Sequence, residues 1–133
     1  MAEPTPEKSL ELARKHLDKV MDAWDDPTDW MDLSTYGLYA LEAAVMAAAA
    51  HVGLEVKRTH WAKADASDEL ADKHSLPAVS DLMEQLNTAR KSEAYGDIDT
   101  PEDLDAETVA TQVEEYVEAV AKLLENDPPE AAP

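Results

Sequence analysis

The residues best suited to bind an anion lie in two short basic segments of an otherwise acidic chain. The first is Lys57-Arg58-Thr59-His60, followed by Lys63, and the second is Arg90-Lys91. An arginine and a lysine together can hold a phosphate or a carboxylate group, and a nearby aromatic ring such as Trp61 or Tyr95 can stack on a base. The predicted ligand-binding residues are Arg90, Lys91, Tyr95, His60 and Arg58.

A second interpretation assigns the same residues to structure alone. Basic side chains in the last turn of a helix interact favourably with the negative end of its dipole, which would account for Arg90 and Lys91. Tyr95 would then be a core residue with its hydroxyl at the surface. Gly96 would be an ordinary residue after a helix end. The sequence leaves both interpretations open.

Several kinds of catalytic and metal site are excluded by what the chain lacks. It has no cysteine, so disulfides, zinc–thiolate sites and cysteine nucleophiles are ruled out. None of its four histidines follows a glutamate by three residues, as a di-iron bundle requires. An EF-hand starting at Asp97 is interrupted by Pro101, and three glycines form neither a phosphate loop nor a serine elbow. We expect no catalytic residue, no metal and no cofactor.

The elements that position the basic segments are predicted to be helices. Alanine and leucine are plentiful, β-branched residues are sparse, and apolar residues recur at three- and four-residue spacing. The second helix is expected to begin after Ser34 or Thr35 and to stop at Gly53. The fourth is expected to begin near Pro77. The predicted helices cover residues 6–24, 34–52, 59–73, 77–95 and 105–125.

The predicted fold class is therefore all-α, a five-helix up-and-down bundle. A single domain is expected at residues 8–125, between disordered tails at residues 1–7 and 126–133, which are rich in proline. In an up-and-down bundle, elements separated by one helix often return to the same end. The two basic segments are therefore expected to converge.

The charge and the apolar pattern limit where the protein acts. Its 30 acidic and 11 basic residues give a net charge of −19, which repels phosphate backbones, so bulk binding to DNA is not expected. The acidic surface would also serve solubility, including in a salt-rich cytoplasm. No signal peptide is expected, and the apolar stretch at residues 38–50 is interrupted by Glu42 and too short to span a membrane. We predict a cytoplasmic protein with no membrane contact.

A long helical pair, a helix ending in LNTARKSEAYGD (residues 86–97) and a final long helix together resemble the HEPN superfamily. The resemblance implies a helical bundle that forms a homodimer, with the Arg-containing helix ends at or near the two-fold interface. It also implies relatives that are ribonucleases or toxin partners of nucleotidyltransferase-type antitoxins.

The nuclease motif of that superfamily, an Arg followed four to six residues later by a His, is incomplete here. Arg90 matches the Arg, but Tyr95, Gly96 and Asp97 stand where the His would be, and no His follows His74. A tyrosine with a pKa near 10 is a poor base at neutral pH, so cleavage of RNA by the usual route is not expected. His60 could substitute only if folding or a dimer partner brings it to Arg90.

Three functions remain open from the sequence. The first is a non-catalytic, dimeric HEPN-like domain that binds a nucleotide, RNA or a protein partner. The second is a ribonuclease or toxin of a toxin–antitoxin or defence system, with a displaced base. The third is a structural interaction module in which Arg90 ties two helices together, for example through Glu42 in the second predicted helix.

Overall fold

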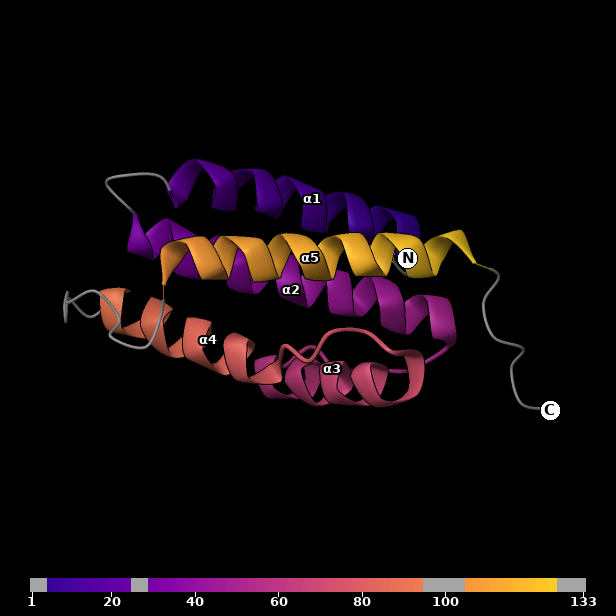
Figure 1. The fold of residues 1–133 in the computed structure, drawn as a ribbon. Coiled ribbons are helices and arrows are strands. Elements are labelled where there is room, and N and C mark those ends of the chain that lie inside the picture. The colour runs from indigo at the N-terminus through magenta and orange to yellow at the C-terminus, as the bar shows by residue number, and fades with distance from the viewer. Residues whose placement is uncertain (1–4, 25–28, 95–104, 127–133) are drawn as a thin grey trace.

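The computed structural model describes residues 5–24, 29–94 and 105–126. These residues form five α-helices and no strands (Figure 1). The helices are α1 (Pro6–Ala23), α2 (Trp30–Val52), α3 (His60–His74), α4 (Ser80–Ala94) and α5 (Ala106–Glu125). The predicted all-α bundle is confirmed.

Local capping residues define three helix termini, of which the end of α2 at Gly53 was expected. Thr59 caps α3 by accepting a hydrogen bond from the amide of Ala62, and Asp105 caps α5 by accepting from Thr108. Helix α2 ends at Gly53, whose positive φ of 79° a glycine adopts without strain.

Two predicted helix starts are wrong. Helix α2 begins at Trp30, a turn before the predicted start, because the side chain of Asp29 caps it through the amide of Asp32. The hydroxyl of Ser34 instead donates to the carbonyl of Trp30, inside the helix. Helix α4 begins at Ser80, so Pro77 lies in the segment that precedes it.

The predicted tails lie largely outside the described residues, which exclude residues 1–4 and 127–133. Helix α1 begins at Pro6, so residues 6 and 7 belong to the bundle. Thr5 precedes this helix as its cap and accepts a hydrogen bond from the amide of Lys8. The division into one domain and two tails otherwise stays a prediction.

Helix α2 is the centre of the bundle and packs against each of the other four described helices. α1 and α5 pack against it and against each other, whereas α3 and α4 follow one another along another side (Figure 1). Its alanines at positions 40, 44, 47 and 48 are fully buried, and small side chains let neighbouring helices approach closely. At Gly37 a Cβ atom would lie 3.3 Å from Cδ1 of Leu86, which shows how closely α4 packs there.

The length of α2 revises one expectation from the sequence. By length and composition this helix could span a membrane, but 72% of its most apolar 18-residue window is buried inside the bundle. Its apolar character is therefore accounted for by the core it forms with its neighbours.

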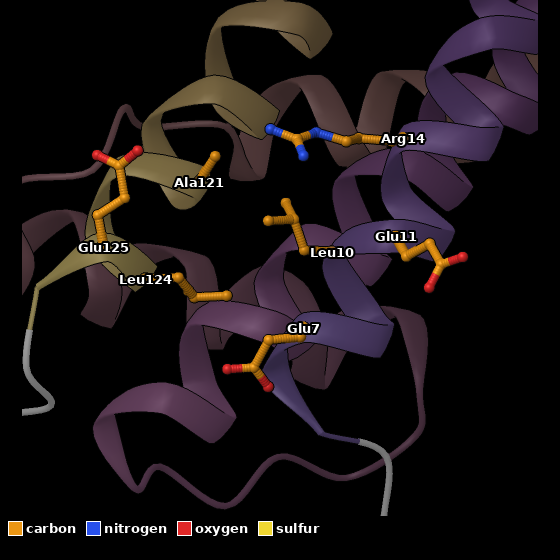
Figure 2. A pocket seen from close by; sticks show the side chains of 7 residues that line it. All are labelled: Glu7, Leu10, Glu11, Arg14, Ala121, Leu124 and Glu125. Carbon is orange, nitrogen blue, oxygen red and sulfur yellow. The ribbon is translucent and has the colours of Figure 1, made fainter.

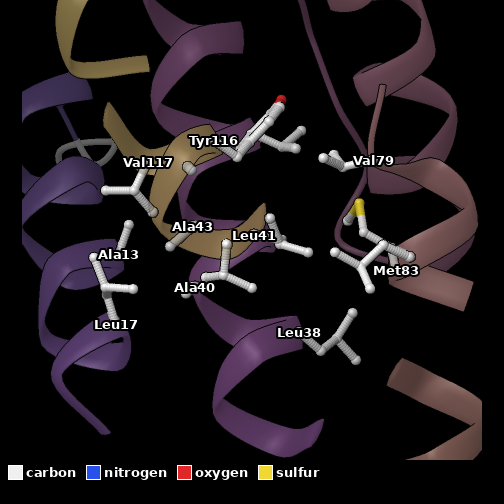
Figure 3. Close-up of a cluster of buried hydrophobic side chains, with 14 of the residues drawn as sticks. Ala13, Leu17, Leu38, Ala40, Leu41, Ala43, Val79, Met83, Tyr116 and Val117 are labelled. Atoms are coloured by element: carbon white, nitrogen blue, oxygen red, sulfur yellow. The ribbon is translucent and has the colours of Figure 1, made fainter. Parts of the chain in front are cut away.

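Burial of Tyr116 gives a prediction about stability. The side chain is 0% exposed among Leu41, Val79 and Met83 (Figure 3), and its hydroxyl has no hydrogen-bond partner among the described residues. Burial raises the pKa of Tyr116. Because the hydroxyl loses its bonds to water on folding, we expect Tyr116→Phe to raise the free energy of unfolding by about 1 kcal/mol.

Chemical denaturation measures this difference, with Tyr36→Phe as the control because Tyr36 is only half-buried. A loss of stability in Tyr116→Phe of more than about 1 kcal/mol would mean that the hydroxyl is bonded in the folded protein.

Candidate functional site

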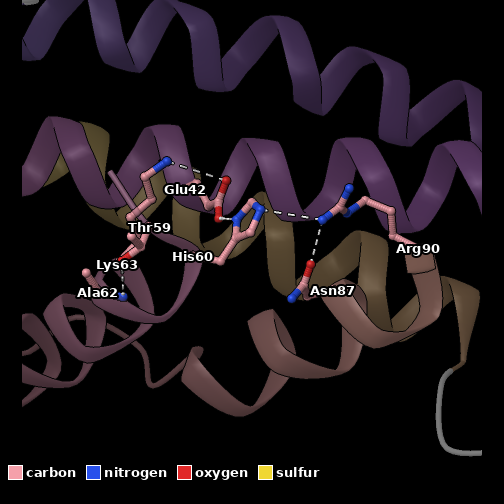
Figure 4. Close-up of polar contacts among 7 residues, drawn as sticks. All are labelled: Glu42, Thr59, His60, Ala62, Lys63, Asn87 and Arg90. Atoms are coloured by element: carbon pink, nitrogen blue, oxygen red, sulfur yellow. Dashed lines mark hydrogen bonds and ion pairs between the residues drawn. The ribbon is translucent and has the colours of Figure 1, made fainter. Parts of the chain in front are cut away.

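A buried carboxylate on α2 organises the site. The side chain of Glu42 is only 7% exposed, and one of its oxygens, Oε2, bonds to Nδ1 of His60 at the start of α3 (Figure 4). Its other oxygen, Oε1, lies 3.7 Å from Nζ of Lys63, one turn further along α3. Buried carboxylates need such partners, so Glu42 fixes the position of the first turn of α3 against α2.

Arg90 reaches the same place from α4. Its Nη2 donates to Oδ1 of Asn87 at 2.7 Å and lies 3.4 Å from Nε2 of His60 (Figure 4). Its Nε is buried and has no hydrogen-bond partner among the described residues. We call Glu42, His60, Lys63, Asn87 and Arg90 the Arg90 cluster.

One protonation state of His60 satisfies both of its contacts. An ionised carboxylate only accepts hydrogen bonds, so Nδ1 of His60 carries a proton and donates to Glu42. A guanidinium only donates, so Nε2 of His60 accepts from Arg90 and carries none. A neutral imidazole with its proton on Nδ1 satisfies both contacts, and the Arg90 cluster then holds two cations, Arg90 and Lys63, against one carboxylate.

The convergence expected from the sequence is found for His60 and Arg90 but not for every predicted residue. Arg58 and Lys91 are exposed, and neither forms a hydrogen bond or ion pair within the described part of the chain. Tyr95 lies outside the described residues. The side chain of Trp61, which the sequence suggested as a stacking surface, is 68% exposed.

Two members of the Arg90 cluster have roles that sequence reasoning missed. The sequence suggests Glu42 only as a direct partner of Arg90, and that pairing is wrong because its two oxygens face His60 and Lys63. Asn87 is not among the predicted residues, although its i, i+3 spacing from Arg90 places both on one side of a helix.

A groove between α1 and α5 contains none of the predicted site residues. It has a volume of about 400 Å³, with Leu10 and Leu124 on its apolar surface (Figure 2). Among the described residues that line it Arg14 is the only basic one, whereas Glu7, Glu11 and Glu125 are acidic. This excess of negative charge makes the groove a poor site for a phosphate.

An imidazole held between two tyrosines forms a separate cluster on α1 and α2. The ring of His16 stacks on Tyr36 at a centroid distance of 5.8 Å and lies 5.5 Å from the ring of Tyr39. Burial lowers the pKa of His16 below its ordinary value of 6.5. The lowered pKa of His16 predicts how the stability of the fold depends on pH.

Because the pKa of His16 is lower in the folded chain than in the unfolded chain, the unfolded chain binds more protons as pH falls. The stabilisation from neutral His16 is complete above pH 6.5 and is lost below it. We expect the melting temperature of His16→Phe to fall less than that of the wild type between about pH 7.5 and 5.5. Parallel curves for the two proteins would contradict a contribution from His16.

The bundle and the Arg90 cluster define the class of protein: an all-α domain with a polar site where three of its helices meet. A family model described as HEPN domain matches residues 7–124. The chain belongs to the HEPN family. Comparison with curated proteins and with solved structures gives no match.

Proposed function

We propose that this HEPN domain is a non-catalytic, dimeric module that binds the phosphate group of RNA or of a nucleotide at the Arg90 cluster. The observation that carries the proposal is the pairing of Arg90. Its described partners are Oδ1 of Asn87 and Nε2 of His60, and neither is a carboxylate.

Among the described residues Arg90 has no carboxylate partner, and such an arginine can form an ion pair with an external anion. Arginine binds phosphate through a planar fork of donors, and such charge-assisted hydrogen bonds are about twice as strong as neutral ones. Lys63 adds a second positive charge nearby. The rest of the acidic surface repels phosphates, so binding is restricted to this local site.

The proposal is non-catalytic because the motif His of the family is missing after Arg90. The residues in its place, 95–97, lie outside the described part of the chain. Binding of a phosphate requires only the donors of the Arg90 cluster.

The accessible side of α2 supports dimerisation beside the Arg90 cluster. Thr35, Tyr39 and Met46 are only half-buried and Ala50 is exposed, although the other residues from 37 to 49 of α2 are buried. These residues recur at helical spacing on the side of α2 that also carries Glu42. A second copy packed there would cover this stripe and place two Arg90 clusters near each other.

Titration of a fluorescein-labelled single-stranded RNA with the purified protein, followed by fluorescence anisotropy at low salt, tests the proposal. We expect saturable binding that weakens as salt is added, and no binding of a DNA duplex of the same length. Absence of saturable RNA and nucleotide binding would overturn it. Light scattering tests the dimer, which a monomer at roughly tens of micromolar would contradict.

A ribonuclease with a displaced base is the second candidate, and one specific observation favours it. Glu42 bonds to Nδ1 of His60, which leaves Nε2 of His60 unprotonated beside Arg90. A carboxylate that orients a histidine in this way prepares its other nitrogen to take a proton. Cleavage of labelled RNA that disappears in both His60→Gln and Arg90→Ala would replace the non-catalytic proposal with this one.

The partner and the location are also proposals. Membership of the family supports a nucleotidyltransferase-type antitoxin as a protein partner and a role in a toxin–antitoxin or defence system. The burial of α2 inside the bundle supports a cytoplasmic location. Native mass spectrometry of the protein purified from its own cells would detect the subunit number, a bound nucleotide and a tight partner together.

A further inference from the structure

We propose that a tetrahedral oxyanion binds between Arg90 and His60 and that its binding takes up one proton on Nε2 of His60. This inference rests on the proposed function and adds to it how the anion is held and how pH controls the site.

The geometry accommodates one oxyanion between the two side chains. Nη2 of Arg90 and Nε2 of His60 are 3.4 Å apart, so both nitrogens can lie about 2.8 Å from a single oxygen. The two side chains can also each bond a different oxygen of the same phosphate or sulfate group. Access is open, since the side chain of His60 is 44% exposed.

In the absence of an anion the side chains of Arg90 and His60 are hydrogen-bonded to each other. Arg90 donates to Nε2 of His60, and this contact occupies the position that the oxyanion requires. A neutral His60 would also direct the lone pair of Nε2 at the incoming oxygen, which is repulsive. A proton on Nε2 removes both obstacles: Nε2 becomes a donor, and Arg90 can no longer donate to it.

The charges around His60 favour its protonation once an anion is present. Glu42 from α2 stabilises a positive charge on His60, whereas Lys63 from α3 and Arg90 from α4 oppose one. The N-terminal end of α3, where His60 is the first residue, also opposes it. An oxyanion between His60 and Arg90 adds negative charge beside both cations and shifts this balance towards the protonated imidazole.

Proton uptake makes the affinity for the anion depend on pH. Because the complex holds one more proton than the free protein, the affinity rises as pH falls. Where His60 of the free protein is neutral, the affinity for the anion rises by up to about tenfold for each unit by which the pH falls, which is the limit for uptake of one proton. By the same linkage, the anion makes His60 titrate at higher pH.

Sulfate is the suitable probe, because it does not itself titrate where histidine does. The imidazole signals of the full chain are followed by NMR from pH 8 to 5, in sodium sulfate and in sodium chloride of equal ionic strength. The signal of His60 is assigned with His60→Gln. His74, at the far end of α3, reports any general effect of the salt.

We expect His60 to titrate at higher pH in sulfate than in chloride, His74 to be unchanged, and the difference to disappear in Arg90→Ala. Sulfate-induced shifts of backbone signals that depend on Arg90, with no change in the His60 titration, would overturn the proton uptake and leave the anion site intact. No Arg90-dependent effect of sulfate at any pH would overturn the inference. The RNA and nucleotide titration described above then decides the proposed function independently.

Discussion

Arg90→Ala is expected to weaken the binding of single-stranded RNA by about tenfold to a hundredfold and to leave thermal unfolding almost unchanged. The loss follows from the hydrogen bonds between a guanidinium and a phosphate, each worth about 1.5–3 kcal/mol, since about 1.4 kcal/mol changes affinity tenfold. Fluorescence anisotropy gives the affinity, and circular dichroism gives the melting temperature.

Stability should change little because of where Arg90 makes its contacts. Asn87 is on the same helix, and the contact with Nε2 of His60 is long, at 3.4 Å. Bonds of this kind contribute about 1 kcal/mol or less to folding. The buried carboxylate of Glu42 keeps its partners His60 and Lys63 in this variant.

The matched control is Arg14→Ala, which removes the same charge from an exposed position on α1 beside the groove shared with α5 (Figure 2). It should bind RNA with nearly wild-type affinity. If Arg90→Ala instead melts much earlier while RNA or nucleotide binding is unchanged, Arg90 is a structural tie between helices. The third function considered from the sequence, a structural interaction module, would then be correct.

Leu41→Ala is expected to destabilise the folded protein by about 2–5 kcal/mol. Leu41 is 0% exposed at the centre of α2, and Figure 3 shows it between the side chains of α4 and α5, including Met83 and Tyr116. Its removal loses buried apolar area and leaves a cavity that the close-packed helices fill only in part. For a chain of 133 residues the melting temperature should fall by roughly 10 °C.

The control for this variant is Leu12→Ala, in which the same atoms are removed from a side chain that is 47% exposed on α1. The expected loss is under about 1 kcal/mol. Chemical denaturation measures both values. Equal losses in the two variants would contradict the central place of α2 in the core.

Much of the helical framework could be predicted because its signals are local. The apolar spacing of α1 and α5, the capping side chain of Thr59 and the glycine at position 53 act within a few residues of themselves. The start of α2 could not be predicted in this way. Asp29, Ser34 and Thr35 are all suitable caps, and Ser34 is fully buried in the folded bundle and bonds back to Trp30 instead.

The sequence by itself determined that this chain is an all-α bundle and that its Arg90 motif lacks a following histidine. Both follow from residue types and from spacing along one helix. Only the tertiary structure decided that His60 meets Arg90 across 30 positions of sequence and that Glu42 holds the imidazole in place. The physical reason is that the Glu42–His60–Arg90 contacts depend on how α2, α3 and α4 pack, whereas helical periodicity constrains only neighbours within one helix.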